Sequence, residues 1–127
     1  MAYETEYYVD QRVIYNRFTQ QMSAEDAEGA NSSTLDLLRE GDAPVHVIID
    51  VSALDLIAID LKELTATVDF PRDNKVGWVI VVGDNPLARI VGSLVMQDGH
   101  VKSRFVESLD EAVNILERMD ATLQHAL

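Results

Sequence analysis

The chain has 127 residues, enough for one domain with its own hydrophobic core, and it contains no cysteine. Disulfides, thiolate metal sites and cysteine nucleophiles are therefore excluded. Ten lysine and arginine residues stand against 22 aspartate and glutamate residues, giving a formal net charge of −12. A surface of this sign repels nucleic acid and anionic lipid, so we expect neither nucleic acid nor a membrane as a partner. No apolar run is long enough for a membrane span, and the first residues lack the pattern of a signal peptide, so we expect a cytoplasmic protein.

The N-terminal part of the chain has the composition of a β-hairpin. Residues 5–9 and 13–18 are rich in β-branched and aromatic side chains, and the short polar segment 10–12 separates them. In the second segment Tyr15 and Arg17 alternate with Ile14, Asn16 and Phe18, so we expect one face of this strand to be wetter than the other.

A helix and a buried strand are predicted to follow. Over residues 23–41, Ser23 and Asp26 have the spacing of a capping box at the helix start, and Gly41 stands where the helix would end. The next segment, VHVIID at residues 45–50, is a short apolar run, which is typical of a strand buried on both faces in a parallel sheet.

The segment after Asp50 is expected to turn quickly into a second helix. This helix should begin near Asp55 and end before Pro71. The supporting observation is an apolar stripe at helical spacing, formed by Ile57, Leu61, Leu64 and Val68.

The rest of the chain continues the alternation of strand and helix. Apolar runs predict strands, and capping residues predict helices that begin at Asn85 and Ser108, the first of them ending before Gly99. The segment 101–106 is more polar than the earlier strand 76–83, so we place it nearer an edge of the sheet.

The resulting order is β-β-α-β-α-β-α-β-α, which predicts a single α/β domain over residues 1–127. Strands that alternate with helices imply right-handed parallel crossovers. We therefore expect a small, mixed and mostly parallel β-sheet, with an antiparallel N-terminal hairpin at one edge and about four helices.

Polar residues are expected at the carboxyl ends of the strands, where ligands of such sheets gather. They are Asp50, Ser52, Asp84 and Asn85. A phosphate-accepting aspartate at Asp50, as in response regulators, would need an acidic pair after the first strand and a lysine after a later one. The chain has neither, so we expect Asp50 to cap the amides of its own loop.

No motif of catalysis or cofactor binding is evident. The three histidines share no metal-binding spacing, and the chain has no G-x-S-x-G elbow, no P-loop and no dinucleotide fingerprint. We therefore expect no metal, no cofactor and no enzymatic activity. The enzyme alternative would use the carboxylates at the strand ends.

The segment VHVIIDVSALDLIAIDLKEL, residues 45–64, resembles the centre of the STAS domain, the fold of the bacterial anti-sigma-factor antagonists. It is most similar to the SpoIIAA-like branch, small bacterial domains related to the CRAL-TRIO lipid-transfer fold. GWVIVVGDNPLARIVGSL and SLDEAVNIL extend the resemblance over residues 8–119.

The resemblance also implies where a regulatory phosphate would be carried. In the regulated antagonists the phosphorylated serine lies at the start of the helix, at positions that correspond here to residues 58–61. No serine or threonine stands there, and Ser52 matches a structural serine, so we expect the usual phosphoswitch to be absent. Asp60 could mimic a permanent negative charge or be a solvated helix residue.

By the same resemblance, a protein partner would bind the loop and helical turn after this strand. The surface would comprise Leu54, Asp55, Leu56, Ile59 and Asp60. In the alternative, the helix buries these apolar side chains between its neighbours.

The resemblance thus implies a non-catalytic interaction and regulatory module with an unknown protein partner, which could also pair as a homodimer. The alternative is a carrier or sensor of a small apolar ligand. A closed core with an exposed patch at Leu56 and Ile59 favours the module, whereas a cavity of a few hundred cubic ångströms favours the carrier.

Overall fold

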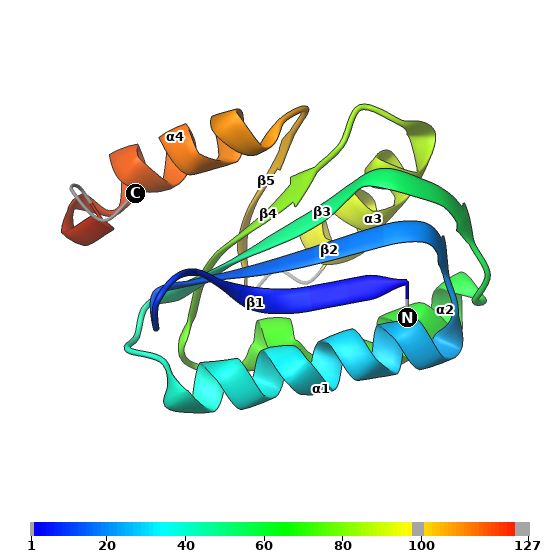
Figure 1. The fold of residues 1–127 in the computed structure, drawn as a ribbon, viewed down its shortest axis with the longest axis horizontal. Coiled ribbons are helices and arrows are strands. Elements are labelled where there is room, and N and C mark those ends of the chain that lie inside the picture. Colours follow the sequence, from blue (N-terminus) through cyan, green and yellow to red (C-terminus); the bar gives the residue numbers. More distant parts are fainter. Residues whose placement is uncertain (1, 98–100, 124–127) are drawn as a thin grey trace.

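The computed structural model describes residues 2–97 and 101–123, which form a five-stranded mixed sheet with helices on both faces (Figure 1). The sheet order is β1-β2-β3-β4-β5; β1 pairs with β2 antiparallel, and the other pairs are parallel. This confirms the predicted α/β class, the hairpin at one edge and the more polar strand at the other. The strands are β1 (Tyr3–Val9), β2 (Val13–Met22), β3 (Val45–Ile57), β4 (Val76–Val82) and β5 (Lys102–Val106).

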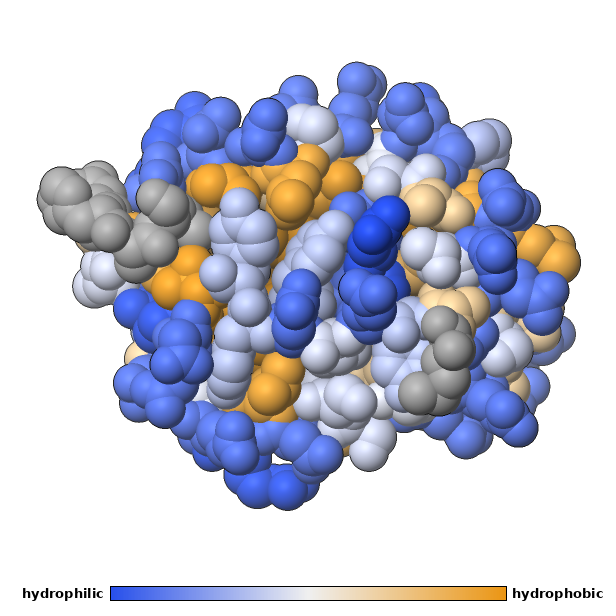
Figure 2. Space-filling model, viewed as in Figure 1, coloured by the Kyte–Doolittle hydropathy of each residue, from blue (hydrophilic) through white to orange (hydrophobic). Residues whose placement is uncertain are grey.

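The helices lie in two layers. Figure 1 shows α1 and α4 on opposite sides of the sheet, and the contacts place α2 and α3 on the side of α1. Hydrophilic residues follow the outer sides of α4 and α1, at the top and bottom of Figure 2, as expected for helices that bury their other side. The helices are α1 (Ala24–Glu40), α2 (Leu61–Thr67), α3 (Pro86–Met96) and α4 (Leu109–Met119), with 3₁₀ turns η1 (Phe70–Arg72) and η2 (Ala121–Leu123).

The alternation of side chains along β3 divides the core in two. Val47 and Ile49 pack in the cluster under α1 and α3, whereas Ile48 packs in the cluster under α4. Arg17 is exposed and Tyr15 is half-buried, whereas Asn16 and Phe18 on the other face are buried, so one face of β2 is wetter than the other, as expected.

Local capping residues set the helix starts, as predicted. Ser23 and Asp26 form a reciprocal capping box at α1. The Asn85 side chain accepts a hydrogen bond from the backbone amide of Ala88, the third residue of α3, and the Ser108 side chain accepts one from the amide of Glu111, the third residue of α4. Gly99, expected just beyond α3, lies outside the described residues.

The prediction of a helix beginning near Asp55 is wrong. β3 continues to Ile57, and α2 begins at Leu61. The physical reason is the length of β2, whose last residues pair with 53–57 through two register shifts and keep this segment extended. Of the predicted helical stripe, only Leu64 is fully buried.

Candidate functional site

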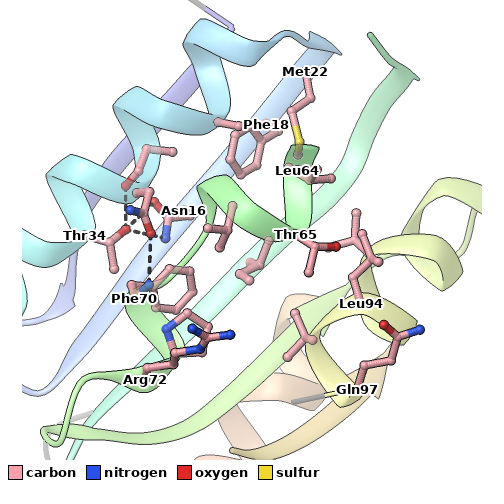
Figure 3. Close-up of a pocket in the computed structure, with 18 residues that line it drawn as sticks. Asn16, Phe18, Met22, Thr34, Leu64, Thr65, Phe70, Arg72, Leu94 and Gln97 are labelled. Carbon is pink, nitrogen blue, oxygen red and sulfur yellow. Dashed lines mark hydrogen bonds between the residues drawn. The ribbon is translucent and has the colours of Figure 1, made fainter. Parts of the chain in front are cut away.

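A cavity of about 710 Å³ lies between the sheet and the helices on the α1 side (Figure 3). Its walls come from β2 and β3 of the sheet, from α1 and α3 on either side, and from the α2–η1 segment. The lining is mainly apolar, with Phe18 and Met22 from β2, Leu64 from α2, and Val91 and Val95 from α3. Protein interiors are normally close-packed, so a space of this size needs a local explanation.

Small side chains on α1 provide that explanation. Ala27, Ala30 and Thr34 recur at helical spacing and are the buried α1 residues that face the cavity. On the other side, α2 has seven residues and buries only Leu64. A row of small residues on a buried helix face is therefore the signal in the sequence that indicates the cavity.

Two polar side chains are buried in the cavity wall. Asn16 is 2% exposed and Thr34 is 0% exposed. Asn16 Nδ2 donates to Thr34 Oγ1 at 2.9 Å, and Thr5 Oγ1 donates to Asn16 Oδ1 at 2.6 Å. Thr34 Oγ1 also donates to the carbonyl oxygen of Ala30 at 2.7 Å, so both side chains are held in fixed orientations.

A single asparagine of α1 holds the turn that closes one end of the cavity. Asn31 Oδ1 accepts hydrogen bonds from the backbone amides of Asp69 at 3.1 Å and Phe70 at 3.0 Å. Asn31 Nδ2 donates to Asp69 Oδ1 at 2.8 Å. The position of η1 is therefore fixed relative to α1, and Phe70 is buried against the core.

The predicted residues at the strand ends form a compact hydrogen-bonded loop. Asp50 is 6% exposed, and its Oδ1 accepts from the backbone amide and the hydroxyl of Ser52, at 2.9 and 2.6 Å. Asp50 Oδ2 accepts from the Tyr15 hydroxyl at 2.5 Å. Burial, followed by this hydrogen bond, raises the pKa of Tyr15 above its ordinary value. Asp50 thus caps its own loop, as expected.

Asn85 lies against this loop, while Asp84 points to solvent. Asn85 Nδ2 donates to the carbonyl oxygen of Val51 at 3.0 Å, and its Oδ1 accepts from the amide of Ala88 at 2.8 Å. Asp84 is exposed. The structure therefore brings Asp50, Ser52 and Asn85 to one loop, where Ser52 bonds to Asp50 and the Asn85 amide bonds to the loop backbone.

The predicted partner-binding residues do not form one apolar patch. Leu54 is 4% exposed and belongs to the core, so its inclusion in a surface was wrong. Ile59 is half-buried against the core, whereas Leu56 is 52% exposed next to the exposed Asp55. Asp60 is the N-cap of α2 and accepts from two backbone amides of that helix, which is a third role beside the two that the sequence left open.

A separate polar network fastens the C-terminal segment to the sheet, near a smaller hollow of about 390 Å³. His46 Nε2 lies 2.8 Å from Asp120 Oδ2, and Arg12 Nη2 donates to the same oxygen at 2.8 Å. The backbone amide of Trp78 donates to His46 Nδ1 at 2.9 Å. Because Nδ1 accepts a hydrogen bond, the proton of the neutral ring is on Nε2 and is donated to Asp120.

The pKa values of the two partners follow from this environment. Burial lowers the pKa of His46, and the neighbouring Asp120 opposes this effect only in part. Burial alone would raise the pKa of Asp120, but hydrogen bonds from Thr122 and His46 outweigh it and lower the pKa to about 2. His46 is therefore a satisfied, buried histidine.

Neither a metal centre nor a membrane span is found in residues 2–97 and 101–123. Over these ranges no three His, Cys, Asp or Glu side chains are grouped so that they could hold a metal ion. Within the same ranges, every helix is too short or too polar to cross a bilayer.

No protein-family model matches the chain, and no curated protein matches its sequence. Solved structures do match. A DUF3478-family protein with a SpoIIAA-like fold from Shewanella loihica has a TM-score of 0.65 at 16% identity, over 91% of this chain and 92% of that one. The unphosphorylated anti-sigma factor antagonist SpoIIAA has a TM-score of 0.59 at 13% identity, over 91% and 96%.

The phosphorylated form of SpoIIAA, the Bacillus cell fate determinant, gives a TM-score of 0.56 at 13% identity, over 91% of this chain and 99% of that one. At these identities the likeness concerns the fold. The relation to the CRAL-TRIO fold remains a prediction from the sequence. The strand order, the helix layers and these matches together show that the chain has the SpoIIAA-like, or STAS, fold.

Proposed function

We propose that this chain is a non-catalytic regulatory domain that binds a small apolar ligand in the cavity between α1, α2 and α3. The observation that carries the proposal is the size of the cavity, about 710 Å³. Ligand pockets in proteins commonly range from about 300 to about 1,000 Å³ and combine apolar walls with a few fixed polar groups. The buried pair of Asn16 and Thr34 matches the second property.

The fold supports a regulatory role. The loop before α2 supports regulation by a bound ligand in place of phosphorylation. SpoIIAA is described as an anti-sigma factor antagonist with a phosphorylated form. In this chain residues 58–61 contain no serine or threonine, and Asp60 is engaged as a helix cap. A ligand that enters the cavity would contact α1, α2 and α3 together, so its binding would change the energetics of all three helices.

A cavity-filling substitution tests this function. Ala30 lines the cavity at 4% exposure, so Ala30→Phe would place an aromatic ring in the space that a ligand needs. The matched control is Ala66→Phe, because Ala66 is exposed on α2. We expect the wild type and Ala66→Phe to enhance the fluorescence of N-phenyl-1-naphthylamine, and Ala30→Phe to reduce its affinity about tenfold or more.

Circular dichroism must show that both variants are folded. Equal affinity of the probe for wild-type protein and folded Ala30→Phe would count against the cavity as a binding site, as would a complete lack of binding to the wild type.

The exposure of Leu56 favours a second candidate function, binding of a protein partner at the end of β3. Leu56 is 52% exposed and lies between the acidic residues Asp55 and Asp60, a combination suited to a partner with a basic, partly apolar surface. We expect Leu56→Asp to lose a partner that the wild type captures from lysate of the native host. Leu61→Asp, at a residue 44% exposed on α2, should retain that partner. Equal capture by both variants would contradict this surface.

A further inference from the structure

We infer that copies of this chain associate head to tail, with the β1 edge of one copy pairing antiparallel with the β5 edge of the next. This interaction surface is independent of the cavity and of the proposed function. It is carried by the opposite charges of the two edge strands and by their direction in the sheet.

The two edge strands are open to a further strand. In the part of the chain that the structure describes, β1 pairs only with β2, and β5 pairs only with β4 (Figure 1). Side chains do not close over them either, because β1 contains no fully buried residue and Val106 is the only buried residue of β5. The outward backbone amides and carbonyls of both strands can therefore bind a strand of another copy.

The β1 edge is acidic on the face of the sheet that carries α4. Glu4 and Glu6 are exposed, and Glu6 lies opposite Tyr15, which packs in the cluster under α4. Glu4 lies opposite Arg17, yet neither glutamate forms an ion pair with another described residue. Their charges are therefore available to a second copy.

The β5 edge is basic on the same face. Lys102 Nζ and Arg104 Cζ lie 5.9 and 5.7 Å from the centre of the Trp78 ring, which also packs in the cluster under α4. Both basic residues are exposed, and neither forms an ion pair with another described residue. In a chain with 22 acidic and 10 basic residues, this edge reverses the overall charge locally.

The charges decide which edges can pair. Like charges opposite one another destabilise a strand pair, whereas opposite charges stabilise it. Two β1 edges would bring glutamates together, and two β5 edges would bring basic residues together, so only the mixed pair is favoured. The repulsion between copies of net charge −12 is screened beyond roughly 8 Å at physiological salt, whereas the side chains of the paired edges would be in contact.

The direction of the strands allows this contact with both copies in the same orientation. β1 runs opposite to the other four strands, so a second copy placed beside β5 presents its β1 antiparallel to β5. The helices do not compete for space, because α1 packs on β1 and β2, whereas α3 packs on β3, β4 and β5. Each copy would retain one unpaired β1 or β5 edge, so the contact can repeat.

One register matches the side chains on both faces. If Glu4 lies opposite Arg104, antiparallel pairing sets Glu6 opposite Lys102 on the α4 face. On the other face the same register sets Tyr3 opposite Phe105, which is 37% exposed. The contact would therefore combine two charge pairs with one aromatic pair.

Reversal of the charges at each edge tests the inference. The variants are Glu4→Lys/Glu6→Lys, which has two basic edges, and Lys102→Glu/Arg104→Glu, which has two acidic edges. Sedimentation equilibrium at rising protein concentration measures the association. We expect weak association of the wild type, because one strand pair is smaller than a standard interface, and an association constant at least tenfold lower for each variant alone.

An equimolar mixture of the two variants should associate as the wild type does. Acidic and basic edges are then again available to each other, and the mean net charge equals that of the wild type. The matched control is Glu28→Lys/Glu63→Lys, which makes the same change of charge as the first variant at exposed helix residues. This control should associate at least as strongly as the wild type.

The inference would be overturned by a wild type that stays monomeric at the highest concentration reached. Association of either edge variant alone at the strength of the wild type would also overturn it, as would a mixture that does not recover the association. Circular dichroism must show that the variants are folded. If a double variant is not, Glu6→Gln and Arg104→Gln replace the pair, and each should weaken the association about threefold; an unchanged association in both would contradict the edge contact.

Discussion

At the scale of single residues, Asp120 links the end of α4 to residues that lie far from it in the sequence. It is the C-cap residue of α4, and its Oδ2 atom accepts hydrogen bonds from two residues of distant elements. These are Arg12, in the turn before β2, and His46, in β3. The side chain of His46 is 3% exposed, so these bonds lie largely out of water. Asp120→Asn would keep one acceptor oxygen but replace the other with an NH₂ donor, so that either Arg12 and His46 or the two donors of Thr122 would lose their acceptor, at a cost of about 2 kcal/mol.

The same contacts give the stability of the fold a defined pH dependence. The pKa of His46 is below its ordinary 6.5 in the folded state, so the unfolded chain binds protons at a higher pH than the folded one. The stabilising effect is therefore complete above pH 6.5 and is lost as the pH falls below that value. Asp120 adds a second loss between its unfolded pKa of 3.8 and its folded pKa of about 2.

Denaturant unfolding at pH values from about 7 down to about 5 measures the first of these losses. We expect the free energy of unfolding of the wild type to fall over this range, and His46→Leu to show a smaller fall even though it is less stable overall. Equal slopes for the two proteins would mean that His46 does not titrate as its burial requires.

At the scale of secondary structure elements, the sequence predicted the features that depend on neighbouring residues. It did not predict the strand pairing between residues far apart in the chain. Ser23, Asn85 and Ser108 cap helices through bonds to amides three residues away, so the sequence alone could locate these helix starts. The extension of β3 to Ile57 depends on its pairing with the distant end of β2. No pattern within residues 51–57 could reveal a partner strand that far away, and the apolar spacing from Ile57 to Val68 imitated a longer helix.

The candidate site also combines a feature set by neighbouring residues, which the sequence predicted, with one set by distant elements, which it did not. The sequence could predict that Asp50 caps its loop, because the residues involved are two positions apart. It could not predict the cavity, which depends on the distance between α1, α2 and α3. The row of Ala27, Ala30 and Thr34 on one face of α1 is the local trace of that cavity, and its meaning depends on what stands opposite.

At the scale of the whole molecule, the two faces of the sheet are packed differently. α4 packs closely on one face, where Ile48, Ile80 and Leu116 are fully buried and the His46–Asp120 contact fixes its end. The other face carries α1 and α3, which stand apart over the cavity and leave space for a ligand. A ligand that binds only the folded state would also stabilise the domain in proportion to its concentration.

Methyl nuclear magnetic resonance during a titration with N-phenyl-1-naphthylamine is the measurement that tests the cavity most directly. We expect chemical-shift changes at the methyl groups of Ala27, Ala30 and Val91, which line the cavity, and none at those of Ala112 and Leu116 under α4. Changes confined to the α4 side, or no changes at saturating probe, would contradict a ligand site between α1, α2 and α3.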